Sequence, residues 1–509
     1  MMNTMKHIIS VILLLVTFGA TAQLSFSGDY HSMGRGANNS FNIDNASLNT
    51  NPSNLGWQSK YYEHKLSINF RDYGFASYSP LLSNSVRKFF KANRYDSIPA
   101  GAARAPLTLP SELFNGDAEQ GRYDTLMPRY ERQDIKTALM KDNIFRSSST
   151  LFGFTYVTPS SGTFSVQVGT EFTGRFNISD NLSDLWVFGK TASYFDTLVL
   201  ADGKKLPNDS VYYENHILYD VVHAFSNDTL TLAEQLDGTQ IEFIGTRNYT
   251  VGWGQEINSN INNATLFVGA NLNIIEGLSY FKFDSFDDAV QIDVATSSTI
   301  NDRRTNAGMG SSVSFGATMI KNDSWFMSAG VNNLGAIRWT QRKEGVSLSY
   351  DSESGEGFFK YPFGTDKFIQ FDDQWDDAGV SLINDSTSAE QNVSFTRATA
   401  ANASLGTKYR FNEYFSVGGD FIMPLNRKAV GSLTQYYASA AAEMSFRKFG
   451  MFSGVNNYNG QLNVPLGFSF GGPDTMIEMG FAVSDLLGYF RQASDITFSF
   501  SIGSVFRFK

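Results

Sequence analysis

The chain has 509 residues, no cysteine, 44 glycines and 44 phenylalanines, with a formal net charge of −10. The lack of cysteine excludes disulfides, thiolate metal sites and a cysteine nucleophile. The acidic balance disfavours nucleic acid as a partner, because nucleic-acid-binding surfaces are basic.

The N-terminus has the pattern of a secretory signal peptide. Lys6 precedes an apolar run over residues 8–18, and the small residues Ala20 and Ala22 follow it at the spacing that signal peptidase reads. The run is too short for a helix that crosses a bilayer core of about 30 Å. The sequence predicts a cleaved signal over residues 1–22 and export to the cell outer membrane.

Residues 23–60 differ from the rest of the chain. Gly34 and Gly36 lie in a stretch rich in Gly and Asn, and the sequence Asn-Pro-Ser-Asn-Leu-Gly occupies residues 51–56. Asn-Pro and Gly are typical of turns, which explains part of the pattern. The order of these motifs, after a signal peptide and before the first strand, resembles the N-terminal segment of FadL-like and PorV-like outer-membrane barrels.

In the FadL-like transporters this segment folds inward as a hatch, so the resemblance implies a hatch or plug over residues 23–60. A second motif of the superfamily, Asn-Leu-Gly where a strand ends, is similar to residues 333–335. The positions that the resemblance marks as family-motif residues are Gly34, Gly36, Asn51, Pro52, Leu55, Gly56, Asn333, Leu334 and Gly335.

Strands are predicted from the hatch onward, over residues 61–509. Leu66, Ile68 and Phe70 alternate with polar residues in the first strand, and tight hairpin turns are expected at residues 158–162 and 321–323. Polar stretches with little alternation predict large extracellular loops near 84–148, 179–240, 284–309 and 341–391, the first of them with one short helix.

The C-terminal part of the chain shows the clearest alternation. From Ile496 to Phe508 the even positions are almost all apolar, whereas the odd positions are mostly small or polar. Similar patterns cover residues 405–411, 415–422, 436–446, 449–455, 462–470 and 477–483. Because a small, polar opposite face suits a water-filled lumen, we predict an all-β fold, a transmembrane antiparallel β-barrel of about 14 strands closed by the last strand.

The motifs of catalysis are mostly missing. Residues 467–471 read G-x-S-x-G around Ser469, but that nucleophile motif requires a strand-to-helix turn, and here it lies in an alternating strand. The histidines, His7, His31, His64, His216 and His223, include no H-x-x-x-H pair. We therefore predict no enzyme activity, no catalytic residue, no cofactor and no metal ligand. The Asp-rich stretches 284–288 and 372–377 are interpreted as solvated loops, with calcium binding as the alternative.

Two functions remain open. The first is FadL-like uptake of a hydrophobic or amphipathic small molecule, which the hatch motifs favour. The second is a PorV-like scaffold or shuttle that binds an envelope protein partner through its long loops. A barrel lipase or esterase based on Ser469 is the least favoured reading. In every case the surrounding partner is outer-membrane lipid, and an apolar cavity behind the hatch would favour transport.

Overall fold

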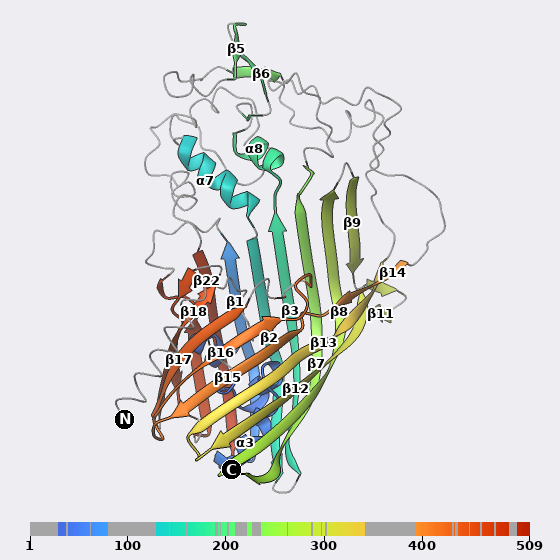
Figure 1. Ribbon diagram of the computed structural model, residues 1–509. Coiled ribbons are helices and arrows are strands. Elements are labelled where there is room, and N and C mark those ends of the chain that lie inside the picture. The colour runs from blue at the N-terminus through green and yellow to red at the C-terminus, as the bar shows by residue number, and fades with distance from the viewer. Residues whose placement is uncertain are drawn as a thin grey trace.

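The computed structural model describes residues 29–79, 129–341 and 393–509 (Figure 1). Within these ranges it leaves out 37–38, 62, 142, 159–160, 189–191, 194, 201–202, 209–220, 226–235, 262, 287–288, 297, 301–302, 430–431, 433–435, 447, 459–460, 473–474 and 488–495. The predicted signal peptide, most of the predicted loops 84–148 and 341–391, and the Asp-rich stretch 372–377 lie outside the described residues.

One antiparallel sheet closes on itself. The last strand β22 (Ile496–Phe508) pairs along its length with the first strand β1 (Leu66–Ser79), so that Leu66 lies opposite Phe508. Three short strands, β9, β14 and β19, each continue the line of another strand of the wall. When each is counted together with the strand that it continues, the described strands form a barrel of 14 strands. The predicted fold and its closure by the last strand are confirmed.

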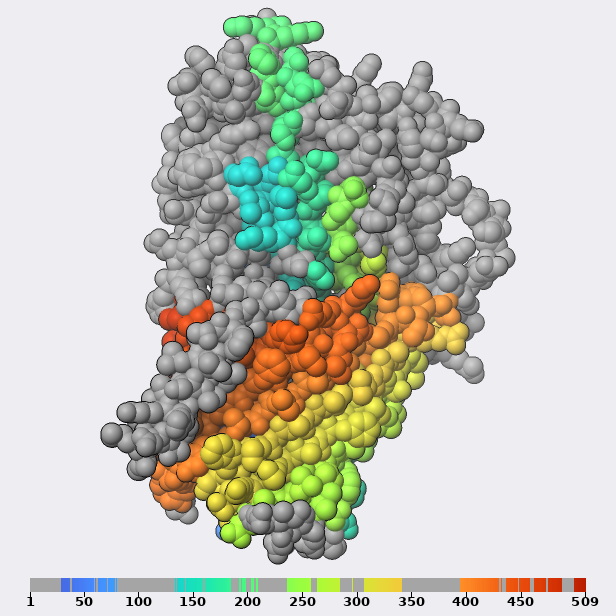
Figure 2. Space-filling view, viewed as in Figure 1, coloured from blue at the N-terminus to red at the C-terminus, as the bar shows by residue number. Residues whose placement is uncertain are grey.

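The other wall strands follow in chain order. They are β2 (Asn143–Thr158), β3 (Gly162–Asn177), β7 (Gln240–Ile261), β8 (Ala264–Phe286), β9 (Ala289–Thr296), β12 (Gly308–Lys321), β13 (Trp325–Gln341), β14 (Val393–Ala398), β15 (Asn402–Arg410), β16 (Phe415–Pro424), β17 (Tyr437–Phe446), β18 (Phe449–Tyr458), β19 (Gln461–Asn463), β20 (Leu466–Phe470) and β21 (Ile477–Val483). Figure 2 shows the slanted strands β13 to β17, in yellow and orange, lying side by side across one face.

Both predicted hairpins are present. Thr158 pairs with Gly162 where β2 turns into β3. Between β12 and β13, Lys321 pairs with Trp325, and Asn322 and Asp323 in the turn have φ of 53° and 55°, the left-handed conformation that Asn and Asp tolerate. These turns lie at the lower end of the barrel in Figure 1.

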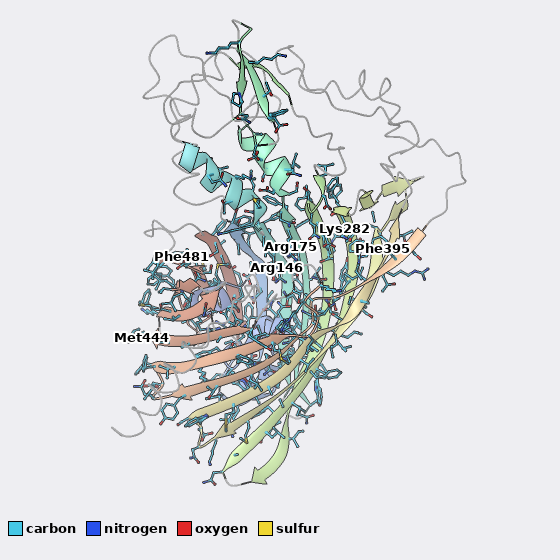
Figure 3. The ribbon with its side chains drawn as sticks, turned by 45° about the horizontal axis from the view of Figure 1, so that its top comes forward. Arg146, Arg175, Lys282, Phe395, Met444 and Phe481 are labelled. Carbon is cyan, nitrogen blue, oxygen red and sulfur yellow. The ribbon has the colours of Figure 1, made fainter. Side chains whose placement is uncertain are left out.

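The outer surface of the wall is apolar and its inner surface is small and polar. Phe470 is 64% exposed, whereas its neighbour Ser469 is 2% exposed. Figure 3 shows Met444 and Phe481 pointing away from the barrel, and both are large exposed apolar side chains. A contiguous apolar surface on a closed barrel is the surface that lipid covers. No helix among the residues that the structure describes is long and apolar enough to cross a membrane.

The upper strands and connections carry more structure than the sequence predicted. Strands β7 and β8 contain 22 and 23 residues, well beyond the about 10 needed to cross a membrane. The expected loop 84–148 ends in helix α7 (Arg129–Met140) and in β2, whose ladder with β3 holds its polar residues in a strand.

The other two described loops are also partly regular. The expected loop 179–240 contains helix α8 (Asp180–Phe188) and a small sheet of β4 (Thr197–Leu200), β5 (Lys205–Pro207) and β6 (Val221–Phe225). The expected loop 284–309 contains β9, β10 (Ser298–Ile300) and β11 (Arg303–Thr305). The alternation of apolar and polar residues did not predict these strands. They lie above the apolar outer surface of the barrel and therefore need no side that faces lipid.

Two strand predictions were wrong in detail. The predicted strand 462–470 is two strands, β19 and β20, because Pro465 has no N–H for the ladder. The predicted strand end at Asn333-Leu334-Gly335 lies inside β13, which continues to Gln341. Asn333 has φ of 56° and forms a bulge there, since asparagine tolerates the left-handed conformation.

Candidate functional site

Residues 29–61 lie inside the lower half of the barrel, drawn in blue in Figure 1. They form helix α2 (Tyr30–Arg35), the 3-10 helix η1 (Asp44–Asn49) and helix α3 (Asn54–Tyr61). The segment contains few apolar residues, but it is deeply buried, and the side chains of Leu55 and Trp57 are 0% and 1% exposed. We call residues 29–61 the internal segment.

Helix α2 is defined by its caps and by its contact with the wall. The Asp29 carboxylate accepts a hydrogen bond from the Ser32 N–H at 3.1 Å at the N-terminus, and Gly36 ends the helix in a left-handed conformation with φ of 70°. A Cβ on Gly34 would lie 2.5 Å from the ring of Phe452. Both glycines of the first motif are therefore required by the local geometry.

The Asn-Pro turn packs against glycines of the wall. The Ser53 hydroxyl lies 2.7 Å from the Thr318 hydroxyl of β12, and the Asn51 amide group donates to the same threonine. A Cβ on Gly316 would lie 1.8 Å from Asn51 Oδ1, and a Cβ on Gly269 would lie 2.3 Å from Pro52. The wall thus lacks side chains where the turn approaches it.

The other two motif residues make the same kind of contact. Leu55 lies against Gly254 of β7, where an added Cβ would be 2.8 Å away, and a Cβ on Gly56 would lie 2.9 Å from the backbone nitrogen of Gln255. All six N-terminal motif positions therefore pack the internal segment against itself or the wall. The other three, Asn333 to Gly335, lie higher in β13, and Asn333 faces the cavity described below.

A buried ionic cluster joins the internal segment to the first and last strands. Arg507 of β22 contacts Asp44 at 3.0 Å and Glu478 of β21 at 2.6 Å. Asp44 also accepts from the Ser67 hydroxyl at 2.7 Å and lies 3.1 Å from His64 Nε2. Asp44 has φ of 53°, an uncommon conformation for a residue other than glycine, which these contacts hold in place.

A second group of charges lies next to the first, around one small shared space. Arg35 of α2 contacts Glu443 of β17 at 3.4 Å, and Lys408 of β15 lies 4.6 Å from the ring centre of Phe41. The backbone N–H of Asn39 donates to Asp420 of β16 at 2.8 Å. The internal segment is therefore held by charged groups from strands around the barrel.

The ion pairs shift the pKa values of two side chains of the internal segment, Asp44 and His31. Burial by itself would raise the pKa of Asp44, but Arg507 and His64 outweigh burial and hold that pKa well below its usual value. Burial would lower the pKa of His31, but Glu478, whose carboxylate lies 2.9 Å from His31 Nε2, raises it above its usual value. Both groups favour their charged forms in the folded protein.

A cavity of about 820 Å³ lies above the internal segment. Leu48 and Asn49 of the internal segment line it from below, and the strands β2, β3, β7, β8, β13 and β14 form much of its wall. Most lining side chains are polar, with an apolar side that includes Ile275, Ile337 and Trp339. An apolar cavity was the expected sign of transport, and this cavity is largely polar instead.

Ser469 of the G-x-S-x-G sequence lies in strand β20 and faces inward, as predicted. It lines a space of about 40 Å³ together with His31. The Nε2 atom of that histidine is already paired with the carboxylate of Glu478. A space of this size holds about three water molecules, so it offers no room for an ester substrate.

Sequence reasoning missed the ionic cluster, although a signal was present. Arg507 occupies the polar side of the alternating terminal strand, and Glu478 occupies the polar side of residues 477–483. A full charge on the small, polar side of a wall strand indicates a partner inside the barrel. Asp44, in an irregular segment, gave no such signal. Within the described part of the chain no group of three or more His, Cys, Asp or Glu side chains could hold a metal ion.

The closed wall, its apolar outer surface and its polar interior define an outer-membrane β-barrel, here with an internal segment across the lumen. The model of the family of unknown function DUF5723 matches residues 111–475. The chain therefore belongs to this family.

Comparison with solved structures finds outer-membrane channels. A deltaS2S3 mutant of the monoaromatic hydrocarbon channel TodX has a TM-score of 0.45 and 9% identity, with 94% of this chain and 97% of that chain covered. The P. putida toluene transporter TodX has a TM-score of 0.40 and 9% identity, covering 95% and 97%. A Pseudomonas aeruginosa FadL homologue has a TM-score of 0.39 and 9% identity, covering 96% and 99%.

The FadL-like resemblance seen in the sequence thus has counterparts among solved structures. No curated protein matches the sequence significantly.

Proposed function

We propose that this protein is a gated outer-membrane channel for the uptake of small molecules, in which the internal segment acts as the hatch. The observation that supports this most directly is the arrangement of residues 29–61. They fill the lower lumen, are joined to the wall by buried ion pairs, and form the floor of a cavity that lies above them.

The hatch is held by both polar and apolar contacts. The polar ones are ion pairs and hydrogen bonds, and the apolar ones join Tyr30 and Met33 to Phe452, and Trp57 to Phe326. Buried ion pairs contribute little net stability compared with apolar packing, because desolvation opposes the Coulomb attraction. The free-energy cost of moving the hatch therefore rests mainly on these few apolar contacts.

The polar lining of the cavity favours a polar or amphipathic substrate over a pure hydrocarbon. A channel for hydrocarbons would bury its ligand among apolar and aromatic side chains. Ile275, Ile337 and Trp339 provide one such side, whereas most of the lining offers hydroxyl, amide or charged groups. The uptake function and this preference are both open to a direct test.

The test locks the hatch with a reversible disulfide. The hydroxyl oxygens of Ser40 in the internal segment and Ser328 in β13 lie 2.5 Å apart, and the chain has no cysteine that could compete. We expect the Ser40→Cys/Ser328→Cys double variant to abolish permeation of small sugars into proteoliposomes when oxidised, and reduction to restore it.

A matched control places the disulfide within the wall. The hydroxyls of Thr155 and Ser165, on neighbouring strands β2 and β3, lie 2.8 Å apart. The Thr155→Cys/Ser165→Cys variant should keep wild-type permeation in both redox states. Equal permeation through the oxidised and reduced hatch variant would refute the gate, and an impermeable wild-type barrel would refute the channel.

A further inference from the structure

The cavity above the hatch is basic, although the protein as a whole is acidic. The charged side chains that line it are six cations and two anions. The cations are Arg146, Arg175, Lys282, Arg397, Arg427 and Lys428, and the anions are Glu171 and Glu242. The described lining therefore carries four more positive than negative charges, within a chain whose formal net charge is −10.

Three of these charges form a row across adjacent strands. Arg175 of β3 lies directly opposite Glu242 of β7, and Glu242 lies directly opposite Lys282 of β8. Side chains at paired positions share one face of a sheet, with Cβ atoms about 5 Å apart. Because all three residues line the cavity, the row faces the lumen; Figure 3 labels Arg175 and Lys282 on the upper wall.

The row continues in register to Asp293 of β9, which lies opposite Lys282, so two cationic and two acidic positions alternate along it. Glu242 accepts a hydrogen bond from the Tyr280 hydroxyl at 3.0 Å, and it interacts electrostatically with Lys282, Arg397 and Arg175. Arg397 comes from β14, a strand that is not a neighbour of β7, so positive charge reaches the cavity from more than one part of the wall.

Arg146 is closely paired with an anion of the same lining. The Arg146 guanidinium contacts Glu171 at 2.5 Å across β2 and β3. Subtracting this pair leaves five cations and Glu242, and counting the acidic position Asp293 of the row as well leaves a positive surplus of three. Arginine and lysine side chains that line a narrow lumen raise the local concentration of anions and lower that of cations, as in anion-selective pores.

From this charge pattern we propose that the cavity is an anion-binding vestibule, and that the channel selects hydrophilic anionic solutes that carry a carboxylate or phosphate group. The row Arg175-Glu242-Lys282 and Arg397 form the selective part. The selectivity rests on the proposed channel function, whereas anion binding in the vestibule requires only the cavity.

The first experiment measures selectivity in planar bilayers under a KCl gradient. The wild-type barrel should give a reversal potential that shows preference for chloride. Replacing three cations together, Arg175→Gln, Lys282→Gln and Arg397→Gln, should lower the chloride-to-potassium permeability ratio several-fold. Arg175 and Lys282 are half-buried and Arg397 is exposed, so the wall ladder does not depend on their charges.

The control removes the same amount of charge far from the cavity. Lys65, Lys321 and Lys448 are exposed residues next to the short turns or at the lower end of β1. Their replacement by glutamine should leave the permeability ratio unchanged. If this control lowered the ratio as much as the vestibule variant, overall charge would set the selectivity and the vestibule proposal would be refuted.

The second experiment is equilibrium dialysis of labelled inorganic pyrophosphate against the detergent-solubilised full chain. The wild-type barrel should bind it, and the vestibule variant should lose that binding by an order of magnitude or more. A barrel that conducts without preference for anions refutes the selectivity. A barrel that does not conduct but binds pyrophosphate through these cations refutes the channel and keeps the vestibule; one that does neither refutes both.

Discussion

Arg507 of the last strand and Asp44 of the internal segment form a buried ion pair with 3.0 Å between guanidinium nitrogen and carboxylate oxygen. The same arginine contacts Glu478 on the neighbouring strand. The strand that closes the barrel therefore also holds the proposed hatch. One side chain thus connects the wall at its closing strand to the internal segment.

Removing Arg507 should loosen both structures. Arg507→Met leaves Asp44 and Glu478 without their shared counter-charge in a buried site, and breaking such a pair costs about 3–5 kcal/mol. We expect a lower midpoint of denaturant unfolding and faster proteolytic cleavage within residues 29–61.

The residue after the same strand provides the control for that prediction. Lys509 pairs with Glu63, but their side chains are 70% and 74% exposed, and exposed pairs contribute little to stability. Lys509→Met should leave the midpoint and the cleavage pattern unchanged. Equal effects of the two substitutions would show that Arg507 does not hold the segment.

A methyl group added at Gly316 should displace the Asn-Pro turn. The Cβ of Gly316→Ala would lie 1.8 Å from Asn51 Oδ1, so either the turn or the strand must move. Overpacking of this kind costs about 1–3 kcal/mol. Hydrogen exchange measured by mass spectrometry should increase in peptides that cover residues 49–58.

Gly330 is the matched control for Gly316 because the two glycines are cross-strand partners in β12 and β13. The nearest atom to a Cβ on Gly330 is the carbonyl oxygen of Phe315 at 3.3 Å. Gly330→Ala should therefore leave exchange in residues 49–58 close to that of the wild type. An increase equal to that in Gly316→Ala would contradict specific contact with the turn.

The stability of the internal segment should decline toward both extremes of pH. The pKa of Asp44 is lowered by folding, so its contribution is present above the unfolded value of about 3.9 and is lost as pH falls toward the folded value. The pKa of His31 is raised by folding, so its contribution is complete below about 6.5 and is lost as pH rises through the folded value.

The variant His31→Gln separates the two effects. Unfolding midpoints measured between about pH 5 and pH 9 should fall with rising pH in the wild type relative to this variant, because glutamine does not titrate. A constant difference across that range would mean that the pair of His31 with Glu478 does not depend on protonation. The decline on the acid side should persist in the variant.

Lys136 should hold the two helices above the barrel together. Its ammonium group contacts Asp184 at 2.8 Å and Asp180 at 2.9 Å, and burial, which would lower the pKa of Lys136, is outweighed by these carboxylates, which raise it. Lys136→Met should increase hydrogen exchange in α7 and α8 while the unfolding midpoint of the wall stays unchanged. The exposed Lys141, just after α7, provides the control Lys141→Met, which should have no effect on exchange in α8.

The barrel could be predicted largely from the sequence. Alternation in Ile496–Phe508 and in the strands before it indicated which side chains meet lipid, because side chains on a strand point to opposite faces in turn. The turns at residues 158–162 and 321–323 followed from local chemistry, since Gly, Asn and Asp tolerate left-handed conformations. These features depend on residues close together in the chain.

Only the tertiary structure decided what fills the barrel. Asp44 and Arg507 are 463 residues apart in the chain, and Arg175, Glu242 and Lys282 come from three strands whose register brings them into one row. Alternation shows that a residue faces inward, but the residue opposite it depends on strand order, stagger and closure. The amino-acid sequence thus determined the wall and its lipid-facing side. The position of the internal segment in the barrel and the charge of the cavity depend on contacts between distant parts of the chain. No local sequence pattern encodes such contacts.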